Sequence, residues 1–222
     1  MRRITWWLAV ACLVVGAWAI PPQWLPWTPL TLDMPPGPFT TLKLRRLSDD
    51  PLACRALLAE DPAIRVEAVD DFTSGDCRLT NLVRVQRTAV EWSSSYLAHC
   101  PLAVAWVIYE RHRLMDVAQT TLGSSVVRVE HLGSLACRNI YGRQQARRSQ
   151  HATAEAIDIA AFILEDGQRV SLTENWGSGS KGLFLKRAGE AACDVFGSVL
   201  GPNYNAAHAD HFHLGIGGGV CR

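Results

Sequence analysis

The sequence predicts an α+β domain that is stapled by disulfides and preceded by an N-terminal membrane segment. Three observations lead to this prediction. Stretches in which apolar and polar residues alternate are mixed with longer stretches of helical spacing, a mixture typical of α+β proteins. Six cysteines stand singly between residues 54 and 221. A predominantly apolar run covers residues 4–20.

The composition is that of an ordinary folded domain and does not indicate a disordered or nucleic-acid-binding protein. With 222 residues, the chain is long enough for one domain of good size plus a tail. Hydrophobic residues make up 48% and charged residues 19% of the chain, and the formal net charge is +1, so neither disorder nor a polyanionic partner is indicated. The sequence has no basic stripe and no nucleic-acid motif, and we expect no nucleic-acid partner. The composition leaves the oligomeric state open.

The N-terminal segment, residues 1–20, has the features of an export or membrane signal. Arg2 and Arg3 precede the apolar run, which is at the short end for a transmembrane helix. We expect an uncleaved anchor with the arginines left in the cytoplasm; a signal peptide cleaved near Ala19 is the alternative. Seven prolines in residues 21–38 predict an extended linker that holds the domain off the membrane. Trp24 and Trp27 either sit at the membrane interface or pack on the domain.

The globular domain is expected to cover residues 39–222. Helices are expected at 54–60, at 101–122 and at 183–200, where Gly123 and Gly201 follow the last two. Strands are expected at 66–69, 82–90 and 126–131, together with a hairpin of residues 160–164 and 169–172 around Asp166-Gly167. The glycine- and serine-rich stretch 176–182 is expected to be a flexible loop and a candidate lid.

The cysteines indicate the redox compartment. Cys12 lies in the apolar run, which leaves an even set of six in the exported part. Six single cysteines in an exported domain predict three disulfides, whose pairing the spacing leaves open. No C-x-x-C pair is present, so a cysteine zinc site is not expected. The domain is therefore placed in the periplasm or the cell exterior. The six are Cys54, Cys77, Cys100, Cys137, Cys193 and Cys221.

Two short stretches carry the chemistry. Residues 149–158 contain S-x-H followed by an aspartate seven positions after the histidine, and residues 208–213 contain three histidines and one aspartate. Four of the chain's seven histidines fall in these stretches. His211 and His213 alternate with Phe212 and would share one face of a strand. A single histidine is usually structural, but two compact clusters that each carry an aspartate favour a zinc site with three protein ligands and an open fourth position.

These residues carry a family resemblance. The pattern S-x-H-x(6)-D followed by D-H-x-H resembles the LAS zinc peptidases, which include D-alanyl-D-alanine carboxypeptidases, murein endopeptidases and the hedgehog signalling domain. The stretches HADHFHLG and CR…SQHATAEAIDIAAF are similar to the extensin-like C-terminal domain family of bacterial envelope proteins, over roughly residues 38–222. The resemblance implies a LAS/hedgehog-type antiparallel sheet with flanking helices. Ala154 stands where the LAS pattern has Gly, a substitution that strains the site if this backbone position needs a positive φ.

The resemblance also implies residue roles. The zinc ligands would be His151, Asp158 and His213. Asp210, three residues before the last ligand, would be the general base, and His211 would stabilise the oxyanion or orient the water. An alternative assignment makes His211 a ligand and His208 the base.

Other polar residues lie around the two motifs. Arg138 is the nearest match to the Arg or Gln that faces the substrate in LAS enzymes; a surface ion pair is the alternative. Ser149 could hydrogen-bond a ligand. Arg143, Arg147 and Arg148 form a basic loop that could attract carboxylates.

The function implied by the resemblance is zinc-dependent cleavage of peptidoglycan peptides in the cell envelope, as an endopeptidase or a carboxypeptidase. The expected location is the periplasm, with the chain anchored to the inner membrane or exported after cleavage. One alternative is a non-catalytic zinc- or peptidoglycan-binding module, and another is a disulfide-stapled structural domain without metal. Asp210 and His211 are both present, which favours the enzyme.

Overall fold

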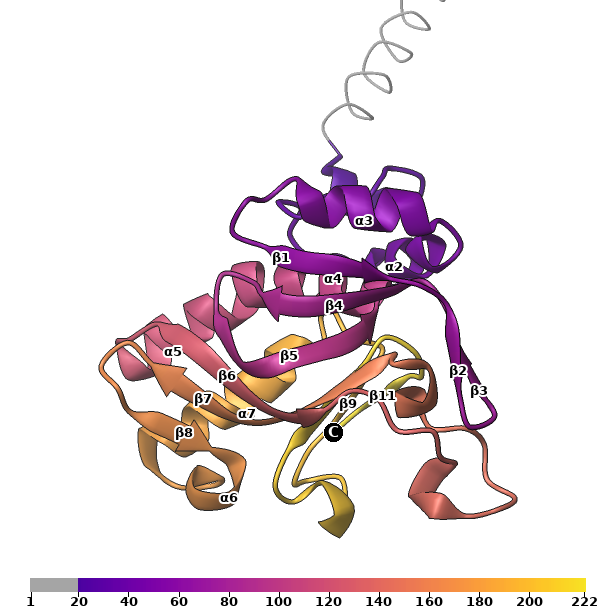
Figure 1. Ribbon diagram of the computed structural model, residues 1–222. Coiled ribbons are helices and arrows are strands. Elements are labelled where there is room, and N and C mark those ends of the chain that lie inside the picture. Colours follow the sequence, from indigo (N-terminus) through magenta and orange to yellow (C-terminus); the bar gives the residue numbers. More distant parts are fainter. Residues whose placement is uncertain (1–19) are drawn as a thin grey trace, which may run out of the picture.

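The computed structural model describes residues 20–222 (Figure 1). The expected N-terminal membrane segment, residues 1–20, falls outside the described residues except for Ile20. Within residues 20–222, no helix combines the length and the apolar character that a membrane crossing requires.

The prediction of an α+β fold is confirmed, with a sheet of nine strands at its centre. The strand order is β1-β4-β5-β6-β7-β10-β9-β11, and β8 pairs with β7 outside this path. The strands are β1 (Arg65–Val69), β4 (Leu82–Arg87), β5 (Glu91–His99), β6 (Val126–Gly133), β7 (Ala156–Leu164), β8 (Arg169–Ser171), β9 (Ser198–Leu200), β10 (Phe212–Gly215) and β11 (Val220–Cys221). A separate hairpin joins β2 (Phe72–Ser74) to β3 (Cys77–Leu79).

The expectation of an antiparallel sheet is wrong at two places, because the sheet is mixed. Strand β5 pairs with β6 in parallel, since a helical connection between them returns the chain to the same end of the sheet. Strand β11 is parallel to β9 because the chain leaves β10, passes β9 and pairs on its far side.

Helices flank the sheet, as expected. They are α2 (Thr40–Ser48), α3 (Pro51–Ala59), α4 (Cys100–Tyr109), a π-helical turn (Glu110–Leu114), α5 (Met115–Leu122), α6 (Leu172–Asn175) and α7 (Gly179–Ala192). All ten residues of α4 are buried, so this helix lies in the core rather than on the surface. Its Trp106 packs against Trp92 of β5, and Tyr109 donates a hydrogen bond to the Ala188 carbonyl of α7 at 2.9 Å. The core is therefore formed between one face of the sheet and these helices.

Two expected elements are corrected. The helix expected at 183–200 ends at Ala192, and Ser198–Leu200 form β9 beside β10. Gly197 allows a close approach to the chain after β10, because a Cβ there would lie 2.7 Å from the Ile216 carbonyl oxygen. The loop expected at 176–182 is shorter, since α7 begins at Gly179. Gly182 is buried, and a Cβ on it would lie 2.8 Å from the Asn175 carbonyl oxygen, so this part of the stretch is packed rather than free.

The prediction of three disulfides is confirmed, and the structure supplies their pairing. The pairs are Cys54–Cys100, Cys77–Cys137 and Cys193–Cys221, with sequence separations of 46, 60 and 28 residues. Each ties together elements that are distant in the chain, and loss of a native disulfide typically costs about 2–5 kcal/mol in small exported domains.

The proline-rich segment 21–38 packs on the domain instead of extending from it. Leu32 and Met34 are buried, and Leu32 belongs to the main core. The Lys43 ammonium of α2 donates to the Pro22 carbonyl at 2.9 Å and to the Thr28 hydroxyl at 2.8 Å. This segment is therefore part of the folded unit.

Candidate metal centre

The three expected zinc ligands meet at one point. Asp158 on β7 lies directly opposite His213 on β10 in an antiparallel pair, and His151 comes from the 3-10 helix Gln150–Thr153 that precedes β7. His151 Nε2 lies 3.0 Å from His213 Nδ1 and 3.1 Å from Asp158 Oδ1. His213 Nδ1 lies 3.1 Å from Asp158 Oδ1, which closes the triangle.

The dimensions of this ligand triangle fit a small cation. Ligands at ~2.0–2.2 Å from a tetrahedral zinc ion lie ~3.3–3.5 Å apart, so edges of 3.0–3.1 Å need little opening to accept one. Both histidines are buried and the carboxylate is mostly buried. The set of two imidazoles and one carboxylate is also one that zinc uses in catalytic sites.

The outer hydrogen bonds of the two imidazoles decide which atoms face the centre. His151 Nδ1 lies 3.1 Å from the Ser134 carbonyl oxygen, and His213 Nε2 lies 2.9 Å from Gln150 Oε1. Because these oxygens can only accept, the outer nitrogens carry the protons and the inner nitrogens carry lone pairs. Three electron-rich atoms then face one another, an arrangement that a cation stabilises.

Electrostatics favour the ionised carboxylate. Burial alone would raise the pKa of Asp158, but hydrogen bonds from His151 and His213, whose inner nitrogens also carry protons when the imidazoles are charged, outweigh it and hold this pKa well below its usual range. The Asp158 carboxylate is therefore charged at neutral pH, as metal binding would require. A bound cation would take the place of the protons on the inner nitrogens.

A supporting shell, which sequence reasoning missed, orients His213. Gln150 Oε1 accepts from His213 and also from the Ser198 hydroxyl at 2.9 Å, so a β9 side chain fixes the amide. Gly215 makes room for it, because a Cβ there would lie 2.0 Å from Gln150 Oε1. Ser134 holds His151 in the same way through its carbonyl. The only sequence signals were the position of Gln150 beside His151 and of Gly215 two residues after His213.

Ala154 adopts the left-handed conformation, with φ 55° and ψ 31°. This position, where the LAS pattern has Gly, therefore does need a positive φ. The residue ends the 3-10 helix of His151, and its carbonyl accepts from the His99 backbone N–H at 2.8 Å. Its methyl group is fully buried with Leu79 and Leu82, and this burial offsets part of the ~1–2 kcal/mol that the conformation costs an alanine.

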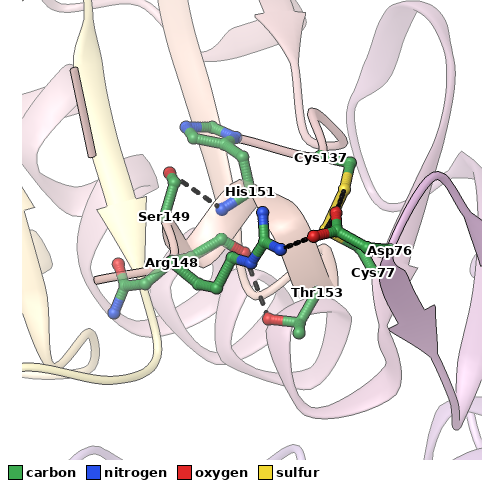
Figure 2. The surroundings of a disulfide bond; sticks show 8 residues. Asp76, Cys77, Cys137, Arg148, Ser149, His151 and Thr153 are labelled. Atoms are coloured by element: carbon green, nitrogen blue, oxygen red, sulfur yellow. Dashed lines mark hydrogen bonds and ion pairs between the residues drawn. A yellow bond between two sulfur atoms is a disulfide. The ribbon is translucent and has the colours of Figure 1, made fainter. Parts of the chain in front are cut away.

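A disulfide lies beside the loop that carries His151 (Figure 2). Cys77 of the β2–β3 hairpin is joined to Cys137, in the segment that runs beside the S-x-H motif. The Ala136 N–H donates to the His151 carbonyl at 3.0 Å. Figure 2 also shows Arg148 directed at Asp76, with which it forms an ion pair beside the disulfide. The hairpin, the disulfide and the ion pair thus hold the loop together.

Asp210, the expected base, is separated from the ligand triangle by the imidazole of His211. Asp210 Oδ1 accepts from His211 Nδ1 at 2.7 Å, while His211 Nε2 lies 3.6 Å from Asp158 Oδ1. The Asp210 side chain is 62% exposed. His211 thus stands between Asp210 and the triangle, and the two residues form a hydrogen-bonded pair.

His208 lies beside the ligand triangle, next to His211 and His213. Its ring lies 5.2 Å from that of His211 and 5.9 Å from that of His213. Burial and the nearby imidazoles lower the pKa of His208 to about 4. The His208 Nδ1 donates to Asn205 Oδ1 at 2.8 Å, and the Asn205 amide donates to the Tyr141 hydroxyl at 2.8 Å. These two bonds connect His208 to the chain just before the basic loop.

The remaining expected residues lie near the motif backbone. Arg138 is exposed; its carbonyl accepts from the Ser149 N–H at 3.1 Å, but within residues 20–222 its side chain forms no hydrogen bond or ion pair. The Ser149 hydroxyl accepts from the His151 backbone N–H at 3.3 Å, so it contacts the ligand residue but not its ring. Of the loop arginines, Arg143 lies over the Tyr141 ring at 5.7 Å and Arg147 is exposed.

The family described as extensin-like protein C-terminus matches residues 52–222, more than half of the chain. The chain belongs to this family. The extensin-like match begins within α3 and includes all six paired cysteines, both motifs and the supporting shell. No curated protein and no solved structure matches the chain. The extensin-like domain thus contains the whole candidate metal centre.

Proposed function

We propose that this extensin-like domain is a zinc-dependent peptidase of LAS type that cleaves peptides of peptidoglycan. The observation that carries the proposal is the ligand triangle, in which two oriented imidazoles and one ionised carboxylate direct lone pairs at one point. The motif pattern S-x-H-x(6)-D with D-H-x-H, which resembles the LAS peptidases, supports the reaction class.

The ligands and their supports have defined roles in this proposal. His151, Asp158 and His213 hold the ion, while the Ser134 carbonyl and Gln150 keep the two imidazoles in position. When bound, zinc supplies a Lewis acid for the scissile carbonyl and lowers the pKa of its water to about 7.

Proton transfer falls to His211 and Asp210. The Asp210 carboxylate accepts a hydrogen bond from the Nδ1–H of His211, which leaves the Nε2 lone pair free on the side of the triangle. Nε2 can then accept a proton there and return it to the leaving amine, while Asp210 stabilises the imidazolium. This geometry supports the two residues as a unit rather than Asp210 acting alone.

The distances also favour one ligand assignment. His213 Nδ1 lies 3.1 Å from Asp158 Oδ1, whereas His211 Nε2 lies 3.6 Å from it. His213 also has its second nitrogen bonded to a fixed amide, as metal-ligating histidines usually do. We therefore assign His213 as the ligand and His211 as the proton carrier.

The substrate and the location follow from charge and redox chemistry. Peptidoglycan stems carry free carboxylates, and the exposed Arg138 and Arg147 lie close to the His151 motif in the chain. Three disulfides require an oxidising compartment. We place the domain in the periplasm, anchored to the inner membrane by residues 1–20 or exported after their cleavage.

One observation favours a second candidate function. The Asp210 carboxylate is exposed and does not face the triangle directly. A module that binds zinc or peptidoglycan without hydrolysing it needs no base at this position, and the geometry is compatible with that role.

Digestion of purified muropeptides by the metal-loaded protein tests both candidates. The peptidase produces new fragments whose masses identify the bond, and a chelator or Asp158→Asn abolishes them. Asp70→Asn is a matched control, because this exposed carboxylate follows β1 and belongs to neither motif. Retention on sacculi without any released fragment would leave the binding module as the function.

A further inference from the structure

Two large apolar side chains near the N-terminal end of the described chain are left uncovered by the domain. Trp24 is 60% exposed and Trp27 is 71% exposed. Tryptophan prefers the interface between a bilayer and water, because its ring is apolar and its N–H donates a hydrogen bond. Trp24 and Trp27 lie four and seven residues after the apolar run of residues 4–20, whose sequence is typical of a membrane segment.

These tryptophans are presented on a braced turn. The turn is closed by the Trp24 N–H, which donates to the Pro21 carbonyl at 2.9 Å, and by the Thr28 hydroxyl, which donates to the Pro22 carbonyl at 2.6 Å. Lys43 of α2 donates to the same turn. The domain therefore holds the backbone turn from which both indoles project.

Basic residues lie next to this turn. Arg45 and Arg46 are exposed on α2, and the Arg46 guanidinium donates to the Pro26 carbonyl. Cationic side chains beside exposed tryptophans match the anionic headgroups of a bilayer surface.

We propose that the turn of residues 20–28, together with Arg45 and Arg46, lies flat on a lipid bilayer with Trp24 and Trp27 at headgroup level. The proposal is independent of any peptidase activity. Figure 1 shows the N-terminal end of the described chain beside α2 and α3, and the C-terminus with β9 and β11 on the opposite side of the domain. The strands around the ligand triangle are then directed away from the bilayer surface.

Depth measurements on spin labels test this orientation. The full chain is placed in nanodiscs of phosphatidylethanolamine and phosphatidylglycerol, with a nitroxide at Trp27→Cys or, as a control, at Leu132→Cys. Leu132 is a matched site, because it is also an exposed apolar side chain, 60% exposed, but belongs to β6. We expect the ratio of oxygen to water-soluble nickel collisions to be severalfold higher at residue 27.

The collision rates would differ if residues 21–27 only tethered the domain to the membrane. If residues 21–27 were an extended spacer, they could carry residue 27 up to ~23 Å from the end of the apolar run. Aqueous collision rates at 27 equal to those at 132 would overturn the proposal. A label at 27 shielded from both reagents would also overturn it, since a protein partner or second copy would then cover the face.

Lys43→Met and the milder Thr28→Val test whether the domain positions the turn. Both remove donors that brace it, and we expect the label at 27 to become more mobile and more accessible to the nickel reagent. An unchanged depth in both variants would contradict the role of the domain.

Discussion

Asp158 and His213 face each other across the β7–β10 ladder, with Oδ1 and Nδ1 3.1 Å apart. Their distance is set by strand register, because directly opposed side chains of antiparallel strands share one face. A slip of one residue would turn one of them into the core. The third ligand, His151, depends instead on a short loop and on its bracing.

The ligand triangle predicts the metal content. We expect about one zinc ion per purified domain and its loss in His151→Ala and in Asp158→Ala, because two ligands cannot complete the site. Elemental analysis after gel filtration measures the ratio, with Asp70→Ala as a control that keeps the metal. Full occupancy in both ligand variants would show that the ion lies elsewhere.

Gln150 is predicted to tune metal affinity without contacting the ion. Gln150→Ala leaves His213 Nε2 without its acceptor, and loss of such a partner typically weakens metal binding about 10–100-fold. Competition with a chromophoric chelator reports the affinity. Gln145→Ala, at an exposed position of the basic loop, is the matched control and should behave as wild type. Equal affinities for both variants would remove Gln150 from the site.

The Asp210–His211 pair is predicted to serve hydrolysis and not metal binding. Asp210→Asn and His211→Ala should keep the zinc and lose about 10²–10⁴-fold in muropeptide cleavage, the usual worth of general acid–base catalysis. Rates and zinc content are measured on the same preparations. If His211→Ala strips the ion while His213→Ala keeps it, the alternative assignment with His208 as base is correct.

The left-handed conformation of Ala154 predicts that replacing it by glycine changes the stability of the protein very little. Ala154→Gly relieves the left-handed strain but loses a buried methyl group, so the free energy of unfolding should change by less than ~1 kcal/mol. Ala152→Gly is the matched control; it is buried two residues earlier at negative φ and should be clearly destabilised. Denaturant titration compares them. A large loss in Ala154→Gly would mean that the methyl contacts dominate.

His99 predicts a pH dependence of stability. Burial lowers the pKa of His99 to about 4, whereas the unfolded chain has the ordinary value near 6.5. The unfolded state therefore binds the proton first, and stability falls as pH drops from about 6.5 to 4, by up to about 3 kcal/mol. Unfolding free energies across this range should fall less steeply in His99→Gln. Parallel profiles for the two proteins would exclude this histidine as the cause.

The parts that the sequence predicted are local. The S-x-H-x(6)-D spacing lies within ten residues, so one helical turn followed by a strand suffices to bring His151 and Asp158 together. Strand β5 was missed because Ser93, Ser94 and Ser95 interrupt its alternation. The mostly apolar stretch 195–200 fits either a helix or a strand by its sequence. Its end becomes a strand because it pairs with β10. Gln150 and Ser198 are 48 residues apart, and no local pattern reports their contact.

The position of β10 late in the chain has a consequence for the order in which the centre can form. His151 and Asp158 emerge well before His213, and the supporting contacts reach Gly215. A chain synthesised only as far as residue 212 holds at most two of the three side chains of the ligand triangle. The triangle and its supporting contacts can therefore form only after the chain has been made beyond residue 215.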